Sequence, residues 1–218
     1  MRPAGRTDFV FDDGGMNLLS SSALRSISAA LPAEGTLFVF RSSRPGLFAA
    51  GADMAEMARF TPFEAYAFSA LGQSVFSAIE SLPMVTVALI DGDCFGGALD
   101  LALSFDLRLA TPRARFSHPG ARLGIVTGFG GTSRWRSVLS RPAARRLFLG
   151  NEVLSAAEAF SIGLVDQVSA SFEEELARLA ALDPVRTRVI KELTRHAERL
   201  SREELVRMAE LLGKVYSG

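Results

Sequence analysis

Apolar runs alternate along this chain with amphipathic stretches at helical spacing. Apolar runs predict strands at residues 36–40, 84–92 and 106–110, and "DFVF" (8–11) and "RARFSH" (113–118) predict two more. The run at 84–92 is β-branched and lacks alternation, which is typical of a strand covered on both faces. Because these strands alternate with helices, we expect an α/β fold with a mainly parallel sheet.

Apolar residues at helical spacing, together with capping signals, predict the helices. Thr61 and Glu64 form a predicted capping box, and so do Ser155 and Glu158. The predicted helices are 16–31, 61–82, 140–150, 155–168, 183–200 and 201–216, with a further one opened by the glycines of "CFGGALD". The two helices at the C-terminal end are amphipathic, so they cover either their own core or a neighbouring subunit.

Two glycine-containing turns, "FAAGAD" (48–53) and "FGGALD" (95–100), each leave a strand-rich region. Small residues allow a ligand to approach the backbone, so two N–H groups can converge on one oxygen and form an oxyanion hole. The alternative is that the glycines only make tight turns. Asp100 raises a related question, because it lies among apolar residues in the first turn of a helix. It is either a proton-handling group or an acid stabilised by the helix dipole.

Composition excludes several classes of function. The 218 residues include 24 basic and 24 acidic ones, and no basic stripe supports nucleic-acid binding. The only cysteine, Cys94, and the distant His118 and His196 make no zinc-ligand spacing, so we expect no metal site. The glycine loops lack nucleotide-binding spacing, and no Gly-x-Ser-x-Gly elbow indicates a hydrolase triad. Without a signal sequence or a membrane-length apolar run, the chain is expected to be cytoplasmic, with no membrane partner.

Four stretches in order resemble the successive signatures of one family. They are "LFAAGADMAEM", "VALIDGDCFGGALDLALSFDLRLAT", "ARFSHPGARLGIVTGFGGTSRW" and "LFLGNEVLSAAEAFSIGLVDQV". Together with "MNLLS" they make the chain similar, from about residue 16 to 168, to the crotonase superfamily, also called the enoyl-CoA hydratase/isomerase family.

The resemblance implies a crotonase-like spiral of ββα units over residues 1–170, followed by C-terminal helices (171–218) for packing or oligomerisation, in homotrimers or homohexamers. It implies an acyl-CoA substrate, with CoA as part of the substrate and no other cofactor. By motif position, the N–H groups of Ala50 and Gly97 would form the oxyanion hole for the thioester carbonyl. The implied substrate-binding residues are Phe48, Ala49, Gly51, Ala52, Asp53, Gly96 and Gly120.

The chain departs from the family pattern at the acid and base positions. Hydratases that it resembles carry two glutamates, and here those positions are Asp100 and Gly120. Hydration by two glutamates is therefore not supported, and Gly120 also counts against an isomerase that uses the second glutamate. In an extended "FSHPG", residues 116, 118 and 120 face one side, so His118 can replace the missing group. The alternatives are a loop histidine beside Pro119, and a Gly120 that only makes room for a larger acyl group.

The function expected from these features is an enzyme of fatty acid metabolism that stabilises a thioester enolate. Asp100 and His118 are its expected catalytic residues. The missing glutamate favours a nonstandard lyase, isomerase or decarboxylase reaction over hydration. Two other interpretations stay open: a catalytically silent member that binds acyl-CoA or acts as a scaffold, and a hydrolase of another thioester.

Overall fold

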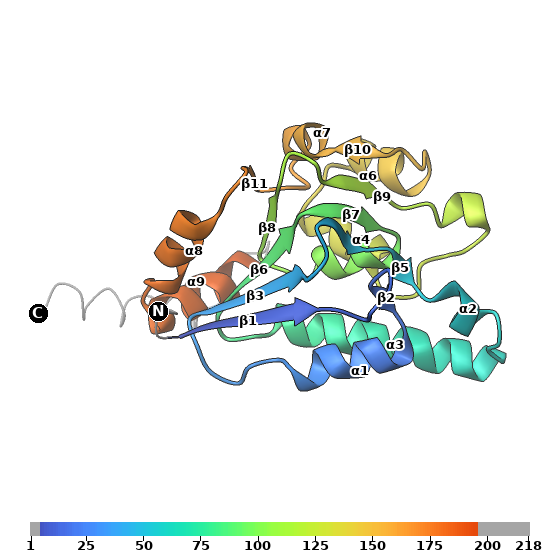
Figure 1. The fold of residues 1–218 in the computed structure, drawn as a ribbon, viewed down its shortest axis with the longest axis horizontal. Helices are drawn as coiled ribbons and strands as arrows, with labels where there is room; N and C mark the ends of the chain where they lie inside the picture. Colours follow the sequence, from blue (N-terminus) through green and yellow to red (C-terminus); the bar gives the residue numbers. More distant parts are fainter. Residues whose placement is uncertain (1–4, 196–218) are drawn as a thin grey trace, which may run out of the picture.

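A five-stranded parallel sheet forms the centre of the molecule, which a computed structural model describes for residues 5–195 (Figure 1). Its strand order is β1-β3-β6-β8-β11, and every neighbouring pair is parallel. The strands are Arg6–Phe11 (β1), Leu37–Ser42 (β3), Val85–Ile90 (β6), Leu107–Ala110 (β8) and Gln167–Val168 (β11). The predicted α/β class and mainly parallel sheet are confirmed.

Both faces of this sheet are buried, as the unbroken apolar strands predicted. Side chains alternate along β3, so that Phe38 and Phe40 face one cluster while Leu37 and Val39 face another. Helices α1 (Ser21–Ala29) and α3 (Pro62–Glu80) cover the first face, as Figure 1 shows. Helix α8 (Glu173–Ala180) covers the second face.

Two smaller sheets extend the fold and bring the glycine turns together. The four-stranded sheet has the order β10-β9-β7-β4, and β2 pairs with β5. These strands are Leu18–Leu19 (β2), Gly46–Ala49 (β4), Gly51–Ala52 (β5), Gly92–Phe95 (β7), Arg115–Ser117 (β9) and Leu154–Ser155 (β10). A strand of the large sheet is repeatedly followed by a strand of a small sheet and then a helix. This succession is the ββα spiral that the family resemblance implied.

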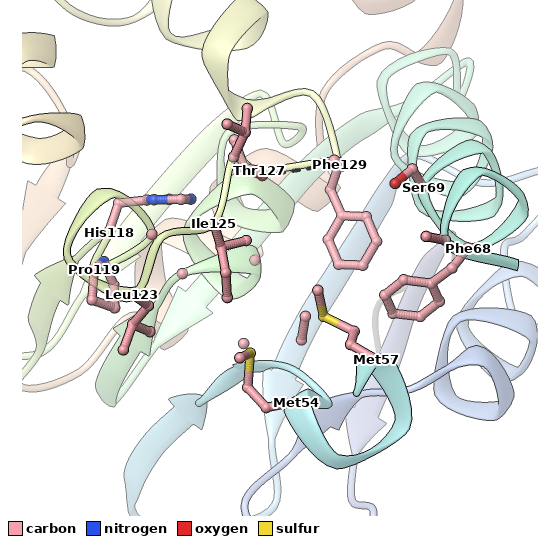
Figure 2. Close-up of a pocket in the computed structure, with 18 of the residues that line it drawn as sticks. Met54, Met57, Phe68, Ser69, His118, Pro119, Leu123, Ile125, Thr127 and Phe129 are labelled. Carbon is pink, nitrogen blue, oxygen red and sulfur yellow. Dashed lines mark hydrogen bonds between the residues drawn. The ribbon is translucent and has the colours of Figure 1, made fainter. Parts of the chain in front are cut away.

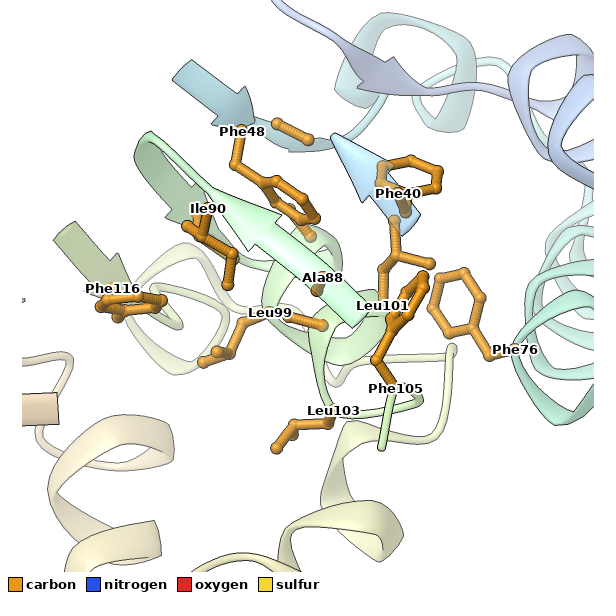
Figure 3. Packing of buried hydrophobic residues seen from close by; sticks show 14 of the residues in the cluster. Phe40, Phe48, Phe76, Ala88, Ile90, Leu99, Leu101, Leu103, Phe105 and Phe116 are labelled. Atoms are coloured by element: carbon orange, nitrogen blue, oxygen red, sulfur yellow. The ribbon is translucent and has the colours of Figure 1, made fainter. Parts of the chain in front are cut away.

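The main hydrophobic core lies between the sheets and the helices. Figure 3 shows Phe48 of β4, Ile90 of β6 and Phe116 of β9 around Leu99 of α4 (Gly97–Ala102), with Phe40 of β3 beside Phe105, and all of these side chains are buried. Close packing of this kind leaves little tolerance for shifts in the backbone. The turns at the ends of β4 and β7 are therefore held rigidly.

The remaining helices are short apart from the last one. They are α2 (Met54–Met57), α5 (Gly131–Arg134), α6 (Arg141–Phe148), α7 (Ala156–Ser161), α9 (Pro184–Arg195) and the 3-10 turns Ala121–Leu123 and Trp135–Ser137. The capping boxes predicted at Thr61 and Ser155 are both confirmed. Within residues 5–195, no helix has the length and apolar character needed to cross a membrane.

The helix predicted at residues 16–31 begins later than expected. Leu18 and Leu19 form β2 and pair with β5, so the helix starts only after its cap, Ser20. The strands β4, β5, β7 and β10 and the helices α2, α5 and α8 were not predicted. The helix predicted at residues 155–168 is too long, because α7 ends at Ser161 and residues 167–168 form β11 beside β8. The predicted helix 201–216 and His196 lie outside the described residues, and the domain boundary at residue 170 stays a prediction.

Arg108 fastens β8 to the segment that leads into β11. Its side chain is almost fully buried, and its guanidinium donates to the carbonyl oxygens of Phe105 (2.7 Å) and Leu164 (2.8 Å) and to the carboxylate of Asp166 (2.9 Å). Removing one partner of a buried ion pair leaves the other groups without compensation.

We predict that Arg108→Leu lowers the free energy of unfolding by about 3 kcal/mol, because it leaves the buried carbonyl oxygens of Phe105 and Leu164 without this donor and breaks the ion pair with Asp166. The matched control is Arg113→Leu, which breaks the exposed pair with Asp91 and is expected to cost less than about 1 kcal/mol. Urea denaturation measures both. Equal losses in the two variants would contradict the structural role given to Arg108.

Candidate active site

The two glycine turns meet in direct backbone contact. Gly51 in β5 has φ 103° and Gly96, just before α4, has φ 55°, conformations that favour glycine. A Cβ atom on Gly51 would lie 2.7 Å from the carbonyl oxygen of Phe95 and 3.2 Å from the nitrogen of Gly97. A side chain at Gly51 would therefore separate the two turns.

The N–H group of Ala50 already has a partner in this structure. It donates to the carbonyl oxygen of Met16 over 3.1 Å. Ala50 does line the cavity described below, but this hydrogen bond occupies the donor that the family resemblance assigned to the oxyanion hole. The geometry therefore departs from the expected pair of Ala50 and Gly97.

Ala52 presents its N–H group in the position expected of Ala50. The neighbouring N–H of Asp53 donates to Leu19 in β2, and successive N–H groups of a strand point to opposite sides, so the N–H of Ala52 points away from β2. The Ala52 nitrogen lies 3.3 Å from where a Cβ on Gly97 would be. Gly97 is the first residue of α4, where the helix itself does not use the N–H group. Ala52 and Gly97 thus offer two adjacent donors.

A cavity of about 280 Å³ opens beside these two N–H groups (Figure 2). Its wall comes from β5, α2, α3, the start of α4 and the loop after β9. The lining residues are Ala50, Gly51, Ala52, Met54, Met57, Phe60, Ala65, Phe68, Ser69, Gly96, Gly97, His118, Pro119, Gly120, Leu123, Ile125, Val126, Thr127, Gly128 and Phe129. Of these described residues, none is aspartate, glutamate, lysine or arginine.

Some of the predicted substrate-binding residues line the cavity, and the others lie in the turn behind it. Four of the seven line the cavity, namely Gly51, Ala52, Gly96 and Gly120. The side chains of Phe48 and Ala49 lie instead in the hydrophobic core, because β4 is covered on both sides. Asp53 caps α2 by accepting the N–H groups of Ala55 and Glu56. These three residues shape the turn and do not form the cavity wall.

Asp100 is completely buried behind the cavity and does not line it. Its Oδ2 atom accepts a hydrogen bond from the hydroxyl of Thr127. Its Oδ1 atom lies 3.3 Å from Nε2 of His118, within ion-pair range, although the orientation leaves both atoms without a hydrogen bond in the described part of the chain. Asp100 and His118 are thus brought together as the sequence analysis expected, but only His118 reaches the cavity.

His118 occupies the space beside Gly120. Its ring is almost fully buried and packs on Phe148 with a centroid separation of 4.8 Å. The Nδ1 and Cε1 atoms lie 3.2 Å from where a Cβ on Gly120 would be, so this edge of the imidazole stands where a side chain at position 120 would begin. The predicted common face of residues 116, 118 and 120 is only partly right, because Phe116 points into the core.

The arrangement of these groups is suited to moving one proton. Asp100 faces one nitrogen of His118, and a buried carboxylate in that position orients an imidazole. The other ring nitrogen is then the one available to a ligand. Among residues 5–195, no three His, Cys, Asp or Glu side chains are grouped so that they can hold a metal ion.

Comparison with known proteins identifies the family. The model of the enoyl-CoA hydratase/isomerase family matches residues 34–214. The chain is 38% identical over 158 residues to the crotonyl-CoA hydratase of Syntrophomonas wolfei, and 35% identical over 178 residues to the mitochondrial methylglutaconyl-CoA hydratase of Mus musculus. The chain therefore belongs to the enoyl-CoA hydratase/isomerase family.

Solved structures have the same fold. The structure of Pseudomonas aeruginosa DspI is 26% identical, with a TM-score of 0.87 over 99% of this chain and 96% of that one. An enoyl-CoA hydratase from Thermoplasma volcanium, 24% identical, has a TM-score of 0.85 over 97% of this chain and 89% of that one. The two curated relatives are matched over 70% and 79% of this chain, but over only 61% and 57% of their own length.

Two contributors to the site were not found in the sequence. Thr127 and Phe129 lie in the glycine-rich stretch "GIVTGFGGT", which is part of a family signature but assigned neither residue to the site. A hydroxyl and an aromatic residue within a loop carry no signal of their own. Only the folded chain shows that Thr127 contacts Asp100 and that Phe129 lines the cavity.

Gly131 packs directly against the carboxylate of Asp100. It is the first residue of α5, and a Cβ atom there would overlap the carboxylate of Asp100. We predict that Gly131→Ala lowers the free energy of unfolding by about 1–3 kcal/mol, because the buried carboxylate cannot withdraw into solvent.

The matched control is Gly15→Ala, whose Cβ would meet only ordinary contacts at 3.5 Å or more from the side chain of Asp13. It is expected to change stability by less than about 0.5 kcal/mol. Chemical denaturation measures both variants. If Gly131→Ala is as stable as the wild type, Asp100 is not held as tightly as described.

Proposed function

We propose that this chain is an acyl-CoA-processing enzyme that stabilises a thioester enolate and moves a proton with one imidazole. The observation that carries the proposal is the placement of His118, with one ring edge beside Gly120 in the cavity wall and Nε2 3.3 Å from the buried Asp100. Family membership supports the thioester substrate.

The oxyanion hole of this proposal consists of the N–H groups of Ala52 and Gly97. Their nitrogens lie on adjoining backbone segments, and both residues line the cavity. Fixed donors aimed at a developing oxyanion contribute about 3–4 kcal/mol each to transition-state stabilisation. The negative charge that forms when a proton leaves the carbon next to the thioester would be held there.

The proton carrier is His118, acting through Nδ1. Asp100 is a positioning residue, since it touches the imidazole and lies outside the cavity. The hydroxyl of Thr127 holds the other carboxylate oxygen and so fixes the direction from which Asp100 faces the ring. This division of roles refines the expectation that both Asp100 and His118 act directly on substrate.

The reaction that fits a single proton carrier is a shift of a carbon–carbon double bond. His118 takes a proton from the α-carbon of a 3-enoyl thioester, the dienolate forms against the two N–H groups, and the same imidazole returns the proton to the γ-carbon to give the 2-enoyl thioester. Although the matched relatives are named hydratases, Gly120 offers no second carboxylate to position water.

The lining of the cavity favours this isomerase reaction over decarboxylation. A malonyl-type thioester would bring a carboxylate into the cavity, and the described lining residues supply no cation to meet it. Burying an unpaired charge is costly. A neutral acyl chain meets mostly apolar or small residues, with Ser69, His118 and Thr127 as the polar ones. A homotrimer or homohexamer and the absence of any cofactor besides CoA stay predictions from the resemblance, and a cytoplasmic location stays a prediction from the sequence.

Exchange of the α-hydrogen for deuterium tests the proposal without knowledge of the product. In D₂O the wild-type protein is expected to catalyse exchange at the α-carbon of butyryl-CoA or 3-hexenoyl-CoA, measured by mass spectrometry. His118→Gln keeps a polar side chain that neither accepts nor releases a proton near neutral pH. It is expected to lose about 100-fold or more of the exchange rate.

Asp100→Asn is expected to cost less than the His118 change, because it weakens only the orientation of the ring. The matched control, Asp91→Asn, removes a surface carboxylate paired with Arg113 and leaves exchange unchanged. Tight acyl-CoA binding with no exchange in the wild type would contradict the enzymatic proposal and favour a catalytically silent member. Thiol release would favour the thioester hydrolase.

Restoring a glutamate at position 120 gives a separate prediction. A Cβ there lies 2.9 Å from the carbonyl oxygen of Ile125 and 3.2 Å from the His118 ring, so Gly120→Glu displaces the imidazole. We expect exchange to fall about tenfold or more, with no gain in water addition to crotonyl-CoA.

The matched variant is Leu123→Glu, which adds the same charge to the half-exposed part of the wall, at a distance from the imidazole. It is expected to reduce exchange less than Gly120→Glu. Efficient hydration by Gly120→Glu would show that the cavity retains the two-carboxylate geometry and that His118 is not a replacement. Crotonyl-CoA absorbance follows the hydration.

A further inference from the structure

The ring of Phe129 lies between helix α3 and the start of helix α4 at Gly97. A Cβ atom on Gly97 would lie 3.0 Å from Cδ2 and Cε2 of the Phe129 ring, and a Cβ on Gly72 of α3 would overlap Cδ1 on the other edge. The ring therefore fits only because both of its neighbours are glycines. Figure 2 shows it on the side of the cavity opposite His118, next to Phe68.

The ring is fixed by aromatic packing on its buried side. Its centroid is 5.1 Å from that of Phe68 and 5.5 Å from that of Phe76, the latter in an edge arrangement, and only 4% of Phe129 is exposed. Packed aromatic pairs of this kind resist displacement. A ligand chain that reaches Phe129 meets a rigid wall.

The opposite rim of the cavity is open. Met54, Leu123 and Val126 are all lining residues with about half or more of their surface exposed, and Val126 reaches 87%. The buried residues Phe68 and Phe129 close the other side. An acyl chain held by its carbonyl at Ala52 and Gly97 thus has solvent on one side and Phe129 on the other.

We propose that Phe129 is a specificity-determining residue, whose ring ends the acyl pocket beside Gly97 and limits the length of the neutral chain that the site accepts. Gly72 has the complementary role, because its missing side chain lets the ring stand back from the cavity. This inference rests on the proposed acyl-CoA function. It adds to that function a limit on the length of the acyl group, which residues of this protein set.

Binding of saturated acyl-CoA esters, from butyryl-CoA to dodecanoyl-CoA, tests the proposal by calorimetry on the full chain, with no dependence on turnover. Each CH₂ buried in an apolar pocket raises affinity about fourfold. The wild-type affinity is expected to rise with length and then to drop about tenfold or more once the chain meets the ring. Phe129→Ala moves this drop to longer chains.

Gly72→Ala moves the drop to shorter chains, because the added methyl group pushes the ring into the cavity. Alanine is the better helix former, so α3 itself is not weakened. The Gly72→Ala variant therefore tests the proposal even if Phe129→Ala fails to fold. Phe172→Ala is the matched control: this phenylalanine is equally buried, packs in the other cluster under α8, and leaves the length profile unchanged.

Different results would contradict the role of Phe129 and the acyl-CoA function on which it rests. If the wild type binds acyl-CoA esters and neither Phe129→Ala nor Gly72→Ala moves the length limit, the role of Phe129 is wrong while the proposed function stands. If the wild type binds none of the esters, the proposed function is wrong, and the chain-length limit with it. Shifts in opposite directions for the two variants are the expected result.

Discussion

The burial of Asp100 constrains every residue around it. A carboxylate without solvent exposure costs several kcal/mol unless polar groups compensate for it. In the described part of the chain, the hydroxyl of Thr127 donates to one carboxylate oxygen, and Nε2 of His118 lies 3.3 Å from the other without a hydrogen bond, while Gly131 has no side chain and so leaves room for the carboxylate. The loop after β9 and the start of α5 must therefore close over α4 in one arrangement. That arrangement also fixes the cavity wall.

The candidate site combines a backbone arrangement that depends on glycines with side chains that depart from the two-glutamate pattern of the hydratases that the chain resembles. The two N–H groups of Ala52 and Gly97 depend on glycines that let β5 touch the start of α4, and on a core that holds both turns. The side chains differ from a pair of carboxylates facing the substrate: one carboxylate has moved behind the wall, and an imidazole stands beside Gly120. With His118 as the proposed proton carrier and no Asp, Glu, Lys or Arg among the described lining residues, we propose a proton shift within a neutral acyl chain rather than water addition.

Much of the fold was predictable from sequence, because strands buried on both faces and capped helices leave local patterns. The capping boxes at Thr61 and Ser155 are direct examples. The helix at 16–31 was predicted too long because the pairing of Leu18 and Leu19 with β5 is a contact distant in sequence. For the same reason, the choice between Ala50 and Ala52 as donor was out of reach: it depends on the partner of each N–H group. Motif position suggested Asp100 and strand parity suggested His118, but their contact was not predicted, and the roles of Thr127 and Phe129 follow only from the folded chain.

The distance between His118 and a bound substrate tests the proposed chemistry most directly. A crystal structure with butyryl-CoA bound would measure it. The thioester oxygen is predicted to lie within about 3.1 Å of the nitrogens of both Ala52 and Gly97, and Nδ1 of His118 within about 3.5 Å of the α-carbon. A thioester oxygen bound elsewhere, or an imidazole turned away from the α-carbon with another proton-carrying group in its place, would contradict a mechanism based on His118.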